Sequence, residues 1–189
     1  MVRRYTGEPV ARDEVERVVR AALHAPSAGF TQGQSFIVVT DPSLRDEVAR
    51  LCGEEHYVGR GFTPWISSAP ALVIACTSAE AYRQRYAEAD KLGPGVALNW
   101  PIPFWYVDAG CALMALLLAA VDAGLAAGLL AIADPPALKG LLRIPAAVEP
   151  VGIVTIGHPA PDRRSGSLRR GRRPESEQIH WDRWRPPPG

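Results

Sequence analysis

Three segments of the chain carry residues that could together hold an anionic, planar ligand. Residues 3–10 read Arg-Arg-Tyr-Thr-Gly-Glu-Pro-Val, and residues 25–32 read Ala-Pro-Ser-Ala-Gly-Phe-Thr-Gln. The small side chains of the second segment would leave backbone N–H groups and a Ser hydroxyl free to approach a ring system. Residues 169–175 read Arg-Arg-Gly-Arg-Arg-Pro-Glu, and such guanidinium groups bind a phosphate dianion through charge-assisted hydrogen bonds. Taken singly, each segment is more typical of a helix cap, a turn or a solvated basic loop.

The sequence contains no side-chain motif that would perform a reaction by itself. The GxSxG, GxGxxG and GxxxxGK[ST] motifs are absent, and none of the four histidines lies in a nucleophile or metal motif. Cys52, Cys76 and Cys111 lack metal-ligand spacing and are odd in number, which argues against a disulfide framework. We therefore expect no catalytic side chain and no metal site. Either the protein is not an enzyme or a cofactor supplies the chemistry.

Length and composition predict one soluble domain. The 189 residues are 47% hydrophobic and 22% charged, with a net charge of +1 that indicates neither a nucleic-acid partner nor a membrane surface. No secretory signal opens the sequence. Only 13 residues separate Asp108 from Asp122, whereas a membrane span needs about 20 continuous apolar residues. We expect a cytoplasmic protein without a membrane partner.

Apolar periodicity and turn residues predict alternating helices and strands. Helices are expected over residues 12–24, 44–51 with Ser43 as N-cap, 79–89 and 136–142. Strands are expected over residues 35–40, 71–76 and 151–156. Residues 128–132 are expected to be extended or a loop, residues 92–104 and 160–173 are expected to be loops, and the alternation in residues 178–184 is compatible with one more strand.

Residues 107–124 predict a long central helix with almost no polar face. A helix that is apolar all round is usually buried all round. Because one small core rarely covers every side of such a helix, we expect a second subunit to cover part of it.

In this order along the chain, the three segments resemble the signatures of the FMN-dependent nitroreductase family. Residues 3–10 fit the pattern Arg-x-Tyr-Thr-x-x-Pro-Val, and residues 25–32 fit Ala-Pro-Ser-x-x-x-x-Gln. The resemblance continues through residues 108–112, 124–125, 141–145 and 151–157 and the Arg-Arg-Pro-Glu run, and leaves out about residues 52–104. The chain departs from the pattern at Phe30, at Gly33 and in the Leu-Leu-Ala-Ile run of residues 129–132.

The resemblance implies an α+β fold, a nitroreductase-like mixed sheet flanked by helices in an intertwined homodimer. Residues 1–189 would form one such domain, with a lid or substrate segment at about residues 52–104 and a C-terminal extension at about residues 160–189. Two FMN sites would lie at the dimer interface. The sequence starts inside the first signature, so we expect the C-terminal arginines to carry more of the phosphate contact than usual.

The resemblance also implies which residues contact the cofactor and the substrate. The implied cofactor-binding residues are Arg3, Arg4, Pro26, Ser27, Ala28, Gly29, Leu129, Leu130, Ala131, Arg170, Arg172 and Arg173. The substrate candidates in and directly after the lid segment are Tyr82, Tyr86, Trp100, Phe104 and Trp105, although packing is the default role of such rings. A zwitterion or a carboxylate could be bound by a set that also includes the two tyrosines: Tyr82, Arg83, Arg85, Tyr86, Glu88 and Lys91. A solvated helix face is the commoner role for such residues.

The implied activity is reduction of an electron-poor small molecule, such as a nitroaromatic or a quinone. NAD(P)H would donate hydride to the FMN and leave, and the acceptor would then bind in its place, which is a ping-pong mechanism. Three alternatives stay open: a non-catalytic FMN-sequestering protein, a deiodinase-like branch and a benzimidazole-synthase-like branch of the same family.

Overall fold

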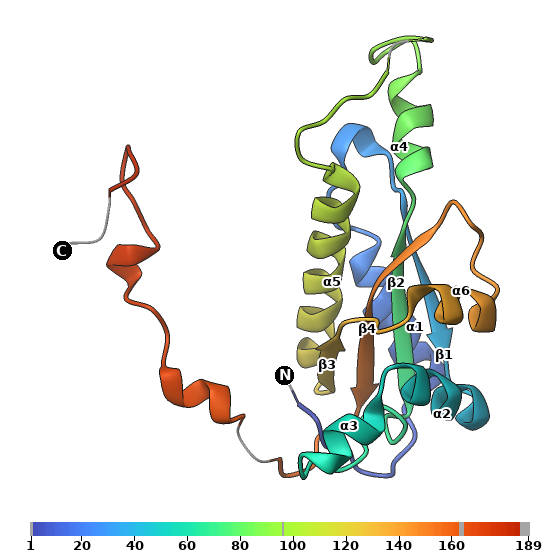
Figure 1. The fold of residues 1–189 in the computed structure, drawn as a ribbon, viewed down its shortest axis with the longest axis vertical. Helices are drawn as coiled ribbons and strands as arrows, with labels where there is room; N and C mark the ends of the chain where they lie inside the picture. Colours follow the sequence, from blue (N-terminus) through green and yellow to red (C-terminus); the bar gives the residue numbers. More distant parts are fainter. Residues whose placement is uncertain (1, 96, 163–164, 186–189) are drawn as a thin grey trace.

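A four-stranded antiparallel sheet lies at the centre of the molecule (Figure 1). The computed structural model describes residues 2–95, 97–162 and 165–185. The strands are β1 (Gln34–Val39), β2 (Ala71–Thr77), β3 (Ala126–Leu130) and β4 (Glu149–Gly157), in the order β1-β2-β4-β3. Every pair of neighbours is antiparallel. The α+β class is confirmed, whereas the expectation of a mixed sheet is wrong for the described residues.

Helices cover both faces of this sheet. Against one face lie α1 (Arg12–Ala22) and α5 (Phe104–Asp122), which pack on Ala71, Val73 and Ala75 of β2. Against the other lie α2 (Pro42–Leu51), α3 (Glu54–Gly59) and α6 (Pro135–Leu142). The alternate β2 residues Leu72 and Ile74 point to that side. This double burial explains why β2 is a continuous apolar run.

The long helix α5 is buried on one side only. Ala112, Leu116 and Ala120 lie against the sheet and α1. On the opposite side Met114 and Leu118 are 55% and 60% exposed, and Val107, Cys111 and Val121 are exposed on the same face. One chain therefore covers this helix on one side only, as expected, and coverage of the other side by a second subunit stays a prediction. By length and apolar composition alone this helix could also cross a membrane, but within this fold it is the helix that covers the sheet.

The N-terminal segment is attached to the far edge of the sheet. Tyr5 forms an isolated antiparallel bridge with Pro159, and the N–H of Val2 donates to the carbonyl of Ala127 on β3. The Tyr5 hydroxyl and the Thr155 hydroxyl share a buried hydrogen bond of 2.5 Å. Burial raises the pKa of Tyr5 to about 12, so this hydroxyl stays protonated. These contacts place Arg3 and Arg4 beside β3 and β4.

Several predicted boundaries need correction. The N-cap of α2 is Asp41 rather than Ser43, because Pro42 fits the first helical position and the Asp41 carboxylate accepts the Leu44 N–H at 2.8 Å. Helix α4 spans Ala79–Tyr86 and stops before the predicted residue 89. Residues 126–130 form strand β3, and α3 was not predicted.

The expected lid or substrate segment contains a strand of the central sheet, and its role as a lid stays a prediction. Its residues 71–77 form β2, a fully buried strand between β1 and β4. Only the parts on either side of β2, which are α3 with its loop and α4 with residues 87–103, lie outside the sheet.

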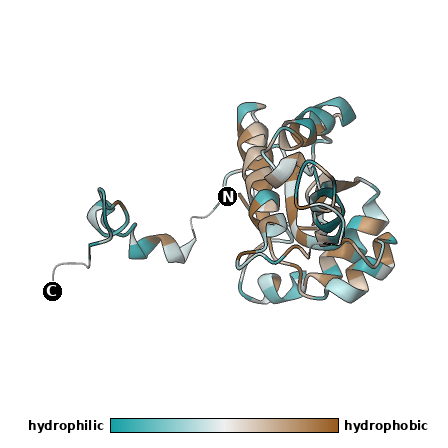
Figure 2. Ribbon diagram, turned by 90° about the horizontal axis from the view of Figure 1, so that it is seen from above, coloured by the Kyte–Doolittle hydropathy of each residue, from teal (hydrophilic) through white to brown (hydrophobic). Residues whose placement is uncertain are grey.

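Residues 165–185 extend away from the rest of the chain in both views (Figures 1 and 2). They contain short 3-10 helices at Gly166–Arg170 and Glu175–Glu177, and the possible strand at residues 178–184 does not form. Leu168, Ile179, Trp181 and Trp184 on this segment are all more than half exposed. Arg163 and Arg164, in the predicted basic loop, lie outside the described residues.

Candidate functional site

The turn that follows α1 has a tightly fixed backbone. It contains a 3-10 helix, Ala28–Phe30, in which Gly29 has φ 64° and Phe30 has φ 54°. The Phe30 N–H donates to the Ser27 carbonyl at 2.8 Å, and the Gln32 N–H donates to the Ser27 hydroxyl oxygen at 2.9 Å. Three of the predicted cofactor residues, Ser27, Ala28 and Gly29, are half-buried here, and Pro26 is exposed beside them.

The expectation that this turn leaves its N–H groups free is partly wrong. The Ala28 N–H donates to Oδ2 of Asp108 on α5 at 2.8 Å. The Asp108 side chain comes from a position 80 residues away and is only 6% exposed. The same oxygen accepts the Tyr82 hydroxyl of α4 at 2.7 Å. The Ser27 hydroxyl can still donate its proton, because the Gln32 contact uses only its oxygen.

The predicted substrate aromatics gather into one cluster between α4 and the start of α5. Trp100 lies at the centre of the cluster, with ring centroids 4.9 Å from Tyr86, 5.4 Å from Phe104 and 6.1 Å from Trp105. Tyr82 is 5.9 Å from Trp100 and fully buried, with its hydroxyl engaged by Asp108. The other four rings keep some exposed surface, and their contact with substrate stays a prediction.

Arg3 is placed as a fixed donor next to the N-terminal bridge. Its backbone N–H donates to Oδ2 of Asp162 at 2.8 Å. Its guanidinium carbon lies 5.5 Å from the ring centre of Phe62 and 5.6 Å from that of Trp65. Its Nε is buried without a hydrogen-bond partner in the described residues. Arg4 is exposed and donates to the Pro161 carbonyl at 3.4 Å. An unpartnered buried donor fits a ligand that brings an acceptor oxygen.

The third predicted cofactor segment lies at the end of an edge strand. Leu129 and Leu130 belong to β3, whose only strand neighbour among the described residues is β4, and Ala131 follows in an exposed position. Leu129 is half-buried and Leu130 is buried. Backbone groups on the open side of this strand are therefore those that a ligand could reach.

The C-terminal arginines are not brought to the other predicted residues within one chain. Arg170 ends the 3-10 helix Gly166–Arg170, and Arg172 and Arg173 follow it, all exposed. Arg173 Nε pairs with Glu177 at 3.2 Å. The segment extends away from the turn after α1, so one chain alone does not assemble the full predicted set (Figure 1).

The charged residues around the end of α4 are engaged with one another. Arg85 donates to both carboxylate oxygens of Asp90, at 2.7 and 2.8 Å, and to Glu88 at 3.0 Å. Its Nε donates to the Gly29 carbonyl at 2.9 Å. The Arg85 guanidinium lowers the pKa of Asp90 to about 2, so this pair stays charged at ordinary pH. These contacts leave little capacity for a zwitterionic ligand.

Sequence reasoning missed Asp108 as part of the site, and it named Arg85 only as a possible zwitterion-binding residue and not as a contact of the turn. Asp108 was noticed only as a charge that breaks an apolar run and as part of a family pattern. An isolated Asp at the buried start of an apolar helix was the available signal, because a buried carboxylate requires donors. Phe62 and Trp65 lie next to the Arg3 guanidinium, and nothing in the sequence other than their aromatic side chains indicated this contact.

Comparison with known proteins agrees with this arrangement. The sequence pattern of the Nitroreductase family matches residues 1–61 and 55–158. The chain is 28% identical to an FMN reductase [NAD(P)H] of Bacillus subtilis over 195 aligned positions, which cover 95% of this chain and 68% of the relative. An iodotyrosine deiodinase of Nematostella vectensis is 25% identical, over 89% of this chain and 67% of its own length.

A solved structure gives the same result for the fold. The hypothetical oxidoreductase YcnD from Bacillus subtilis superposes with a TM-score of 0.76 at 27% identity, over 98% of this chain and 71% of its own. With the family pattern covering most of the chain and the fold shared along almost its whole length, the protein belongs to the nitroreductase family.

Proposed function

We propose that the protein is an FMN-dependent oxidoreductase that uses NAD(P)H to reduce an electron-poor small molecule, such as a nitroaromatic or a quinone, by a ping-pong mechanism. The observation that carries the proposal is the buried Nε of Arg3, which has no hydrogen-bond partner among the described residues and lies within the first stretch matched by the family pattern. Relatives named as an FMN reductase [NAD(P)H] and as an NAD(P)H nitroreductase support the cofactor and the hydride donor.

The residues present fit FMN. When bound, the flavin supplies the hydride-accepting chemistry, which explains why no protein side chain needs to act as acid or base. Arg3 would stabilise negative charge at the pyrimidine end of the ring, and the Ser27 hydroxyl would donate to an acceptor on the ligand. The backbone at Leu129, Leu130 and Ala131 would face the ring from the edge of the sheet.

The turn at Pro26–Gly29 would approach the flavin across the interface between two copies of the chain, and the C-terminal contacts would also require a second copy. We propose a homodimer in which the exposed face of α5 packs against its twin and the C-terminal segment crosses to the partner. Arg170 and Arg172, with Arg173 beside them, would then reach a phosphate that one chain leaves unbound. The exposed Trp181 and Trp184 would be covered by the same crossing. We further propose a cytoplasmic location.

The substrate pocket would be completed by the aromatic cluster. Tyr86, Trp100, Phe104 and Trp105 would exclude water and stack on a flat acceptor. A deiodinase-like activity is the second candidate, because one relative is an iodotyrosine deiodinase. The Arg85–Asp90 pairing speaks against a zwitterion held by α4, since the charged groups are already paired.

Anaerobic mixing of the FMN-loaded protein with NADH and with NADPH tests this function. Loss of the flavin absorbance near 450 nm, followed by its return when a nitroaromatic or quinone is added, is the expected result. Bound FMN that neither nucleotide bleaches would make the protein a flavin store. Failure of the purified protein to bind added FMN would overturn the cofactor assignment.

A further inference from the structure

We infer that Asp108 and Arg85 are positioning residues that fix the backbone of the cofactor-facing turn and couple it to helix α4. That this turn faces a flavin rests on the proposed function. The two hydrogen bonds that hold the turn, called fastenings below, are present within the single chain and do not depend on a flavin. They hold two consecutive residues of the turn: Asp108 accepts the N–H of Ala28, and Arg85 donates to the carbonyl of Gly29.

The first fastening is a buried carboxylate between two donors. Oδ2 of Asp108 accepts the Ala28 N–H at 2.8 Å and the Tyr82 hydroxyl at 2.7 Å. Asp108 is 6% exposed and Tyr82 is fully buried, so water does not compete effectively with the bond between them, while the bond to the Ala28 N–H is partly buried. Burial, together with the hydrogen bond to Asp108, raises the pKa of Tyr82, which keeps its hydroxyl protonated and donating.

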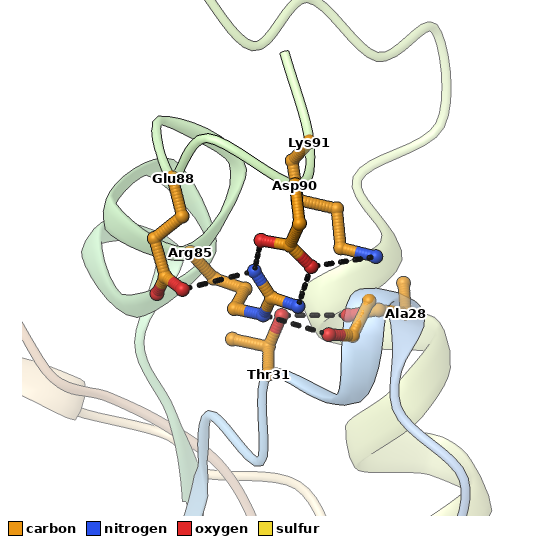
Figure 3. A network of polar contacts seen from close by, with 7 residues as sticks. Ala28, Thr31, Arg85, Glu88, Asp90 and Lys91 are labelled. Atoms are coloured by element: carbon orange, nitrogen blue, oxygen red, sulfur yellow. Dashed lines mark hydrogen bonds and ion pairs between the residues drawn. The ribbon is translucent and has the colours of Figure 1, made fainter. Parts of the chain in front are cut away.

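The second fastening is a guanidinium held in a fixed orientation. Figure 3 shows Arg85 forked on Asp90 while its Nε points toward the turn at Ala28 and Thr31. That Nε donates to the Gly29 carbonyl at 2.9 Å. Because both terminal nitrogens of the planar guanidinium are engaged, the group keeps one orientation. It therefore directs its Nε–H at a single acceptor. Glu88 binds it from a third side, so the turn after α4 is part of the same network.

The turn needs such fastening because of its composition. Gly29 has φ 64° and no side chain, so by itself it would sample many backbone conformations. The ring of Tyr86 on α4 occupies the space that a Cβ at Gly29 would need, with its Cε2 only 2.8 Å from that position. Helix α4 thus supplies three contacts to the turn: Tyr82 through Asp108, Arg85 directly, and Tyr86 by packing.

Amide hydrogen exchange of residues 27–32 in flavin-free protein tests the two fastenings. Asp108→Ala and Arg85→Ala should each speed exchange in this turn at least tenfold. Arg83→Ala is the matched control, because Arg83 lies on the same helix and pairs only with Glu80 on the exposed side. Asp108→Asn, whose amide oxygen can accept both hydrogen bonds, should restore most of the protection.

FMN affinity, measured by titration of the same variants, tests the positioning role. We expect Asp108→Ala and Arg85→Ala to weaken FMN binding about tenfold, which is about 1.4 kcal/mol, and Arg83→Ala to leave it unchanged. Tyr82→Phe removes one donor without emptying the core and should weaken binding by a smaller factor. It also serves if Asp108→Ala fails to fold.

The outcomes separate this inference from the proposed function. Unchanged exchange in the turn of folded Arg85→Ala and Tyr82→Phe proteins would overturn the inference, even where the wild type binds FMN. Faster exchange with unchanged FMN affinity would also overturn it, because the turn would then be fastened without positioning the cofactor. A wild-type protein that binds no FMN at all would remove the proposed function, while the exchange result would still decide whether the fastenings exist.

Discussion

At the scale of single residues, the arginines of this chain differ in how far they are constrained. Arg3 and Arg85 are each held by other groups and direct a donor at a defined place. Arg170 and Arg172 lie on an exposed segment and have no ion pair among the described residues. Under the proposed function, Arg170 and Arg172 would gain a binding role only when a phosphate and a second chain come close to them.

Arg172→Ala should weaken FMN binding by about tenfold to a hundredfold. A hydrogen bond to a charged partner contributes about 1.5–3 kcal/mol, and each 1.4 kcal/mol is a factor of ten in affinity. Fluorescence titration of FMN against the apoprotein measures the change. Riboflavin, which lacks the phosphate, should bind wild type and variant almost equally, and Arg183→Ala serves as a control from the same segment. If neither Arg172→Ala nor Arg170→Ala changes FMN affinity, the basic segment is a solvated loop and Arg3 and Arg4 become the next candidates.

At the scale of elements, local chemistry sets where helices begin, and α2 offers a clean case. Asp41 accepts the Leu44 N–H and the Ser43 hydroxyl at 2.8 and 2.6 Å, so the carboxylate is the cap and Ser43 supports it. The Ser43 hydrogen bond and the backbone N–H of Leu44 lower the pKa of Asp41. The ionised cap therefore stabilises the folded state.

Asp41→Ala should lower the urea midpoint of unfolding at pH 7 more than Ser43→Ala does. The Asp41 contribution is complete above the unfolded carboxyl pKa of about 3.9 and is lost as the pH falls through its lower folded value. Urea titrations of the three proteins at pH 7 and near pH 3 measure this, and the gap between wild type and Asp41→Ala should narrow at the lower pH. A larger loss for Ser43→Ala at pH 7 would show that Ser43 is the cap after all.

At the scale of the whole molecule, the face of α5 opposite the sheet is an apolar surface that the single chain leaves exposed. Val107, Met114, Leu118 and Val121 are 42–67% exposed along one helical stripe. Contiguous exposed apolar surface of this kind marks an interface, and obligate interfaces typically bury about 2,000 Å² or more. The extended C-terminal segment, with its exposed tryptophans, adds a second surface of the same type.

The wild type should sediment at twice the chain mass of 20.4 kDa. The double variant Met114→Glu, Leu118→Glu should shift it toward the monomer, because two buried carboxylates would face their twins across the interface. Val58→Glu, on an exposed apolar residue of α3 at the other face of the sheet, is the control and should leave the mass unchanged. A folded wild-type monomer at micromolar concentration would contradict the dimer.

The sequence by itself determined most of the helices and strands and the family. Helices α1, α5 and α6 and strands β1, β2 and β4 follow from apolar periodicity and from Pro and Gly at their ends, which are local properties. The three segments that could hold a ligand were recognisable because turn residues and clustered arginines can be identified from short stretches of sequence. Family membership followed from their order and is confirmed by the family pattern over residues 1–158.

Only the tertiary structure decided strand direction and the partners of the turn. A buried apolar run such as β2 is the same in a parallel sheet and in an antiparallel sheet covered on both faces, so a mixed sheet could not be told from an antiparallel one. The partners of Ala28 and Gly29 are Asp108 and Arg85, which lie 80 and 56 positions away. Such contacts depend on how α4 and α5 pack against the turn, and spacing along the chain does not encode that packing.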